Sequence, residues 1–151
     1  MNFSTKSEYG LRALTILARQ YGKGPYSLAD IAKTEEVSLP YLERLFAKLR
    51  SADIVESTRG AQGGYQLSRS PELINIYEVV RTLDGYLVPA VCVFETGPVI
   101  GQCKRVQNCR LRGVWRKVQD RLEKTLREIT LMDLVEKKPV AKKKILPKAK
   151  R

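Results

Sequence analysis

The sequence predicts a mainly α-helical fold with one short β-hairpin and one long helix toward the C-terminus. Three observations predict it. Apolar residues recur every three or four positions in several separate segments of the 151-residue chain. Two short strand-like runs follow the third of these segments and flank a glycine-rich turn. A final apolar repeat continues for about twenty residues, which corresponds to a helix of roughly 30 Å.

The first helix is expected over residues 5–21, where leucines and other apolar residues recur at helical spacing. Thr5-x-x-Glu8 has the form of a capping box at its start, in which each side chain bonds a backbone N–H of the first turn. A stretch that contains glycine and proline, residues 22–25, then interrupts the pattern and indicates a turn.

Two short helices joined by a tight turn are expected next. Ser27 begins the first of them, and Ser38 caps the second, which tolerates Pro40 in its first turn. The second has an inward-facing apolar stripe: Leu42, Leu45, Phe46 and Leu49. Such a pair has the form of a helix-turn-helix, whose second helix enters the major groove of DNA. An ordinary helical hairpin is the alternative.

Residues outside that stripe are the candidates for DNA contacts. Tyr41, Arg44 and Lys48 are expected to contact bases or phosphates in the major groove. Ser38, near the helix N-terminus, is expected to reach a phosphate.

A β-hairpin is expected directly after the third helix, formed by residues 54–58 and 65–68. A hairpin in this position has the form of a wing, and a plain hairpin tip is the alternative. Glycines in its loop allow positive φ angles and a close approach to a phosphate backbone, and an arginine supplies charge. The wing residues expected to approach DNA are Arg59, Gly60, Gly63 and Gly64.

A fourth amphipathic helix, from Ile76 to Asp84, is expected to end at Gly85, a residue type common at helix C-termini. It completes a winged helix-turn-helix domain over residues 1–85. Residues 86–110 follow as an irregular loop that holds all three cysteines, at positions 92, 103 and 109. An odd number of reduced cysteines is a poor disulfide framework but a reasonable partial set of metal ligands.

A long helix is expected over residues 111–135, with apolar residues spaced as in a coiled coil. They are Trp115, Val118, Leu122, Thr125, Ile129 and Met132. We expect the same helix of a second copy to cover this face in a two-fold dimer. Packing back across its own domain is the alternative.

The chain is basic, with 28 Lys and Arg against 16 Asp and Glu and a net charge of +12. The last fifteen residues hold eight of these basic residues and no acidic one, which leaves +4 for residues 1–136. The composition of residues 136–151 cannot build a core, so a disordered basic tail is expected. A polyanion such as nucleic acid fits as the partner.

Several classes of protein are not expected. No apolar stretch approaches the roughly 20 residues needed to cross a bilayer, and the first eleven residues lack an export signal, so a cytoplasmic protein is expected. Histidine is absent, which removes histidine-based acid–base and nucleophilic catalysis. Because the chain also lacks a phosphate-binding glycine loop, an enzyme is not expected.

Four motifs give the chain a family resemblance. They are Ser4-Thr5-Lys6-x-x-Tyr9-Gly10-Leu11-Arg12-Ala13-Leu14; Ile31-Ala32 with Val37-Ser38-x-x-Tyr41-Leu42-Glu43; Arg59-Gly60-Ala61-x-Gly63-Gly64-Tyr65-x-Leu67; and Glu78-Val79-Val80-x-x-Leu83-Asp84-Gly85. Over about residues 1–134 the chain resembles the Rrf2 family of bacterial winged-helix regulators. That resemblance implies a homodimer with an N-terminal winged helix-turn-helix, a cysteine-bearing loop and a long dimerisation helix.

The resemblance also implies a sensor in the loop. In cluster-binding members three cysteines hold an iron–sulfur cluster, and they correspond to Cys92, Cys103 and Cys109 here. Many relatives add a histidine at the position of Arg112, which this chain lacks, and others use an acidic residue of the N-terminal helix across the dimer, which corresponds to Glu8. The first cysteine spacing is longer than usual, so a 2Fe-2S and a 4Fe-4S cluster both remain open.

By this interpretation the protein is a DNA-binding transcriptional repressor of a near-palindromic operator, which senses iron, nitric oxide or redox state through the cluster. A regulator of the same fold without a cluster, controlled by a protein partner, zinc or thiol oxidation, is the alternative, and inert cysteines are a further one.

Overall fold

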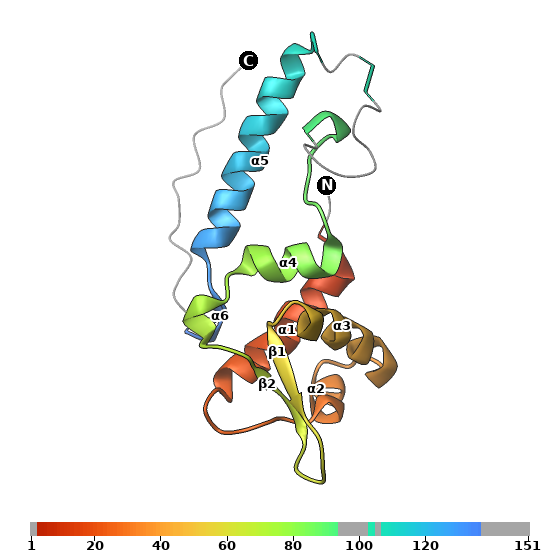
Figure 1. The fold of residues 1–151 in the computed structure, drawn as a ribbon, viewed down its shortest axis with the longest axis vertical. Helices are drawn as coiled ribbons and strands as arrows, with labels where there is room; N and C mark the ends of the chain where they lie inside the picture. The colour runs from red at the N-terminus through yellow and green to blue at the C-terminus, as the bar shows by residue number, and fades with distance from the viewer. Residues whose placement is uncertain (1–2, 94–102, 105–106, 137–151) are drawn as a thin grey trace, which may run out of the picture.

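The structure is a computed structural model that describes residues 3–93, 103–104 and 107–136. The predicted basic tail beyond residue 136 and much of the predicted cysteine loop lie outside this part of the chain. The elements, labelled in Figure 1 where there is room, are α1 Thr5–Arg19, α2 Leu28–Thr34, α3 Leu39–Ser51, β1 Val55–Thr58, β2 Gly64–Leu67, η1 Pro71–Leu73, α4 Ile76–Asp84, η2 Val91–Val93, α5 Arg110–Glu128 and α6 Leu131–Val135. The predicted mainly helical fold with a two-stranded wing is confirmed.

Helix α1 begins one residue earlier than the predicted capping box requires. Ser4 is the N-cap residue, and its Oγ accepts a hydrogen bond from the Lys6 N–H at 3.1 Å. Glu8 therefore lies too far along the helix to bond back to the cap, and its carboxylate pairs instead with Arg12 at 2.6 Å. The predicted Thr5–Glu8 capping box is wrong for this reason, and the helix ends at Arg19 rather than at residue 21.

Helices α2 and α3 form the predicted helix-turn-helix. Ser27 caps α2 by accepting a hydrogen bond from the Asp30 N–H at 3.4 Å. Ser38 occupies the N-cap position of α3 without a side-chain hydrogen bond, and Pro40 lies in the first turn. The four residues of the predicted stripe are all buried: Leu42, Leu45, Phe46 and Leu49. The sequence pattern therefore gave the inward face of α3 correctly.

Strands β1 and β2 form the wing. They pair in antiparallel register, from Val55 opposite Leu67 to Thr58 opposite Gly64. The other edge of β2 bonds to the α1–α2 connection, because Tyr26 and Tyr65 exchange two backbone hydrogen bonds of 2.8 and 2.9 Å. The ring of Tyr65 contacts Phe46 edge to face, with ring centroids 5.0 Å apart. Tyr65, next to the loop end of β2, thus attaches the wing to the core, and the loop beyond it extends away from the body (Figure 1).

Helix α4 packs against α1 and α3 and ends at Gly85, whose φ of 84° confirms the predicted glycine cap. The carboxylate of Asp84 accepts hydrogen bonds from both the backbone N–H and the hydroxyl of Ser4. Burial favours the neutral carboxyl, but the hydrogen bonds from Ser4 and Ser7 and the charge of Lys6 outweigh it, so the pKa of Asp84 lies below its usual value. This contact joins the start of α1 to the end of α4.

The predicted continuous helix over residues 111–135 is interrupted. Helix α5 ends at Glu128, and a capping box between Thr130 and Asp133 begins the separate helix α6. The residues between the two helices are extended and bond to the α4 segment: the Ile129 carbonyl accepts from the Ile76 N–H, and the Leu131 N–H donates to the Ile74 carbonyl, both at 2.9 Å. A strong N-cap signal and these backbone bonds override the apolar repeat.

The core of the winged-helix body includes residues from α6. Leu131 is fully buried in the same cluster as Leu14, Phe46 and Val79, and α6 packs against α1 and η1. Residues outside the predicted range 1–85 therefore complete this core. No residue of helix α5 is fully buried, although Leu122 and Leu126 pack against the core, and Figure 1 shows the helix extending away from the body, on the side opposite the wing loop. In the part of the chain described above, no helix is long and apolar enough to span a membrane.

Candidate nucleic-acid interface and cysteine loop

The exposed face of α3 lies opposite its buried stripe. Arg44 is on this face, as predicted, together with two residues that the sequence reasoning missed, Glu43 and Arg50. Arg50 donates a hydrogen bond from Nη1 to the Ser57 hydroxyl of β1 at 3.2 Å and so connects α3 to the wing. Glu43 and Arg50 are seven residues apart, which places both on one side of a helix. This spacing could have been read from the sequence.

Tyr41 does not lie on the exposed face. Its ring contacts Tyr9 of α1 edge to face, with centroids 6.1 Å apart, and its hydroxyl oxygen is buried without a hydrogen-bond partner. The side chain therefore fills the contact between α1 and α3, and its geometry does not suit the predicted contact with DNA. Ser38 and Arg44 are exposed, as that prediction requires.

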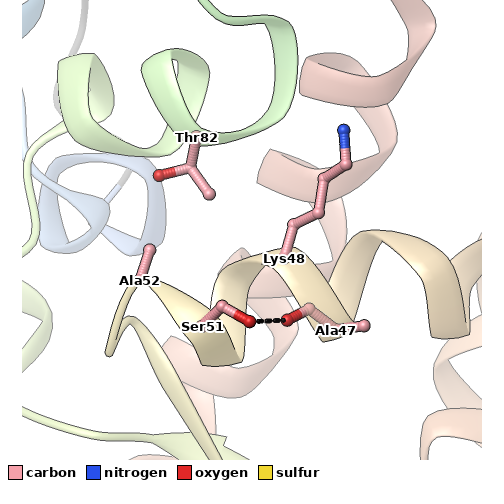
Figure 2. Close-up of a pocket in the computed structure, with 5 residues that line it drawn as sticks. All are labelled: Ala47, Lys48, Ser51, Ala52 and Thr82. Atoms are coloured by element: carbon pink, nitrogen blue, oxygen red, sulfur yellow. Dashed lines mark hydrogen bonds between the residues drawn. The ribbon is translucent and has the colours of Figure 1, made fainter.

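Lys48 borders a shallow recess between α3 and α4, shown in Figure 2. The recess is lined by Ala47, Lys48, Ser51, Ala52 and Thr82. Both hydroxyl groups already donate within their own helices, Ser51 to the Ala47 carbonyl at 3.0 Å and Thr82 to the Glu78 carbonyl at 2.8 Å. The Lys48 ammonium is the donor left to face the recess, so this surface suits a single phosphate contact at its edge rather than an enclosed anion site.

The wing glycines have different roles from those predicted. Of the three, Gly60 alone takes a positive φ, 116°, and has open space around it. A Cβ on Gly63 would contact the Thr58 carbonyl, and a Cβ on Gly64 would contact the Tyr26 carbonyl, so these two allow close packing within the protein. The prediction that all three serve positive φ angles is therefore wrong, while Arg59 is exposed in the loop as expected.

The three cysteines are partly buried free thiols. Cys92 lies in η2, and Cys109 is the N-cap residue of α5. Arg112 connects these two segments, because its Nε donates to the Cys92 carbonyl at 3.0 Å and its backbone N–H bonds the Cys109 carbonyl at 3.2 Å. Among the residues placed by the structure, no three His, Cys, Asp or Glu side chains come together as a metal-binding group. Within one protomer, the described residues therefore do not by themselves form an assembled metal site.

Glu8, the predicted fourth ligand, has a partner of its own. Its carboxylate forms an ion pair with the Arg12 guanidinium at 2.6 Å. The same guanidinium also lies 3.8 Å from the carboxylate of Glu35 at the end of α2. Both members of the Glu8–Arg12 pair are about half exposed, so this surface pair contributes little to stability.

The predicted dimer interface divides into two parts. Trp115 and Val118 are exposed on α5 at 37% and 39%, whereas Leu122 packs against the core. Ile129 and Met132 lie beyond the end of α5, and Ile129 also packs against the core. The sequence reasoning missed Leu111 and Val114, which are 61% and 51% exposed on the same side as Trp115 and Val118. The exposed apolar face thus lies in the N-terminal half of α5.

A helix-turn-helix followed directly by a two-stranded wing, with exposed arginines on both, defines a winged-helix DNA-binding protein. Comparison with known proteins identifies its family. The family model "Rrf2: Iron-dependent Transcriptional regulator" matches residues 3–137. The chain therefore belongs to the Rrf2 family of transcriptional regulators.

Individual relatives agree with this assignment. The HTH-type transcriptional regulator CymR of Bacillus subtilis (strain 168) is 37% identical over 134 residues, which cover 89% of this chain and 89% of that protein. The structure of CymR (YrzC), the global cysteine regulator of B. subtilis, gives a TM-score of 0.73 at 35% identity and covers 91% of this chain and 98% of that one. The structure of T. potens IscR gives 0.70 at 39% identity, with 91% and 88% covered.

Proposed function

We propose that the protein is a dimeric transcriptional repressor that binds a near-palindromic operator in double-stranded DNA. The observation that carries this proposal is the placement of α3 and the wing, whose exposed residues extend from the same body and are linked by Arg50 and Ser57. Ser38, Arg44 and Lys48 contact the major groove and its phosphates, and Arg59 and Gly60 approach the adjacent backbone or minor groove.

The dimer is formed through α5. Four large apolar side chains, Leu111, Val114, Trp115 and Val118, are between 37% and 61% exposed along one face of this helix. A contiguous apolar face of this kind is typical of a protein–protein interface, because burying it removes apolar surface from water. A second copy offers the identical face and gives the two-fold symmetry that a near-palindromic operator requires.

Effectors act through the cysteine loop. In the first form of the proposal, Cys92, Cys103 and Cys109 hold an iron–sulfur cluster, completed by Glu8 of the partner protomer, and the cluster responds to iron, nitric oxide or redox state. The chemistry of the donor set supports it, since thiolates are the preferred ligands of such clusters. The description of the matching family model as iron-dependent supports it as well.

A second form, control without a cluster, is favoured by two observations. The residues placed by the structure do not gather three metal ligands, and Glu8 is paired with Arg12. In this form, thiol oxidation or a protein partner acts on the loop; zinc, the other alternative, needs the cysteines to come together as a cluster does.

DNA binding is tested by operator titration of single variants. Arg44→Ala and Arg59→Ala should each weaken operator binding about fivefold or more, since one lost arginine contact costs about 1–3 kcal/mol. Lys117→Ala, which removes an exposed charge on α5, is the matched control and should leave affinity unchanged. Equal affinity for all three variants and the parent protein would contradict the proposed interface.

The absorbance of the purified protein and its content of iron and sulfide distinguish control with a cluster from control without one. Protein purified without oxygen is analysed for absorbance, iron and sulfide, and its operator affinity is measured before and after chelation. A brown protein whose affinity changes on chelation supports the cluster, and each cysteine-to-serine variant should then lose the response. A colourless protein that stays free of iron after reconstitution supports control without a cluster.

A further inference from the structure

Arg69 lies directly after the wing, where the chain turns toward α4. Its guanidinium contacts two different elements: Nη1 donates to the Asp53 carbonyl at 2.6 Å, and Nη2 forms an ion pair with the Glu78 carboxylate. Both charged side chains are about two-thirds buried, at 33% and 30% exposure. A partly buried arginine that donates from two nitrogens of its planar guanidinium to two separate acceptors holds them in a defined geometry, unlike a mobile surface pair.

The Asp53 carbonyl belongs to the tight turn between α3 and β1. Asp53 itself takes a positive φ of 53°, which is uncommon for a residue other than glycine. Its carbonyl also accepts a hydrogen bond from the Ser68 hydroxyl, and the Ser68 N–H bonds the Ile54 carbonyl at 3.1 Å. The end of β2 therefore holds this turn from one side, and Arg69 extends that connection to α4.

Glu78 gives the other end of the connection a fixed position. It lies in the first turn of α4, where its backbone N–H donates to the Asn75 side chain at 3.0 Å. Arg69 thus joins three elements at one point: the end of α3, the end of β2 and the start of α4. The remaining side-chain hydrogen bond between α3 and the wing in the described part of the chain, Arg50 to Ser57, is exposed at 3.2 Å.

We propose that Arg69 is a positioning residue for DNA binding: it fixes the angle of the wing relative to α3 so that both contact one duplex together, without touching DNA itself. The proposal rests on the proposed function, in which α3 and Arg59 bind the same operator half-site. Simultaneous contact demands accurate spacing, because hydrogen bonds weaken steeply beyond their normal geometry.

The test combines substitutions at Arg69 and Arg59. Arg69→Lys keeps the positive charge but cannot donate in two directions with a planar fork. The connection of the wing to the α3–β1 turn and to α4 should therefore loosen, although the Tyr26–Tyr65 backbone pairing still holds β2. Operator affinity is measured for Arg69→Lys, Arg59→Ala and the double variant at one salt concentration. Arg69→Lys should weaken binding several-fold, and the double variant should bind no more weakly than Arg59→Ala alone. Lys124→Arg, a charge-preserving exchange in the exposed Lys124–Glu128 pair of α5, is the control and should bind normally.

A footprint separates positioning from a general loss of folded protein. Hydroxyl-radical protection by Arg69→Lys should fall at the flank that the wing covers and persist where α3 binds, whereas partial unfolding would reduce both equally. Circular dichroism checks that each variant is folded at the assay temperature, and Glu78→Gln, which removes the ion pair from its other side, should repeat the Arg69→Lys result.

Each remaining outcome overturns the inference. Unchanged affinity of Arg69→Lys, or effects of Arg69→Lys and Arg59→Ala that multiply in the double variant, would show that Arg69 does not act through the wing. If Arg59→Ala itself binds normally, the wing does not contact DNA, and the wing part of the proposed function fails together with this inference. Normal binding by Arg44→Ala as well would contradict the whole interface.

Discussion

Gly64 is the position where one added carbon should disturb the wing most. A Cβ at Gly64 would lie 2.7 Å from the carbonyl carbon of Tyr26 and 3.1 Å from its nitrogen. These are backbone atoms held by two hydrogen bonds of 2.8 and 2.9 Å between Tyr26 and Tyr65, so no side-chain rotation can relieve the contact. Because carbon atoms pack at about 3.5–4.0 Å, the two segments must separate by roughly 1 Å.

The size of the effect follows from what that separation breaks. Both Tyr26–Tyr65 hydrogen bonds lengthen beyond a useful distance, and at about 1 kcal/mol each they cost about 2 kcal/mol. Residual overpacking adds about 1 kcal/mol. Replacing glycine also lowers the conformational entropy of the unfolded chain, which offsets about 0.4–1 kcal/mol of this loss in stability. Gly64→Ala should therefore lower the free energy of unfolding by about 2 kcal/mol.

Urea unfolding followed by far-ultraviolet circular dichroism measures this difference, at one protein concentration because the proposed dimerisation would add a concentration-dependent contribution to stability. Gly113→Ala is the matched control. Gly113 lies in α5 with no atom within 4 Å of its added Cβ, so alanine should raise stability by up to about 1 kcal/mol through helix propensity. A Gly64→Ala protein as stable as the parent, beside a stabilised Gly113→Ala, would refute the tight contact at Tyr26.

Three further predictions test other parts of the structure. Hydrogen bonds hold the folded-state pKa of Asp84 below its usual value, so the ionised carboxylate stabilises the fold above about pH 4, and this stabilisation is lost as the pH falls. Asp84→Asn should therefore be less stable than the parent protein at neutral pH, and the difference between their urea midpoints should narrow below about pH 4. A difference that grows in acid would contradict this sign. Thr130→Ala removes the capping box of α6 and should cost about 1 kcal/mol in the same assay, and an unchanged midpoint would show that the cap is dispensable. Deleting residues 137–151, which carry eight basic residues, should make operator affinity less dependent on salt without changing the preferred operator, and an equal salt slope would remove the tail from DNA binding.

The order of the elements was readable from the sequence because each depends on local signals. Helical spacing gave the buried stripe of α3, the paired strand-like runs gave the wing, and Gly85 gave the end of α4. These features are set by residues close together in the chain, so their prediction needed no knowledge of tertiary contacts.

What the sequence did not give depends on distant contacts. Tyr41 has helical spacing suited to an exposed face, yet Tyr9 of α1 covers it. The apolar repeat from Trp115 to Met132 predicts one helix. In the structure, residues 129 and 131 instead form backbone hydrogen bonds with residues 74 and 76, and these bonds separate α5 from α6. Gly63 and Gly64 look like flexible loop residues, although neighbouring carbonyls are what require them.

The burial of Leu131 has a consequence for how the chain folds. Helix α6 packs on α1, so the DNA-binding body depends on a contact between segments more than a hundred residues apart. Contacts of such long range slow folding, because the loop between the segments must close before the contact forms. During synthesis the N-terminal residues therefore emerge without the side chain that completes their core. The body reaches its native packing after α5 has left the ribosome, so the helix proposed for dimerisation is already available when the body matures.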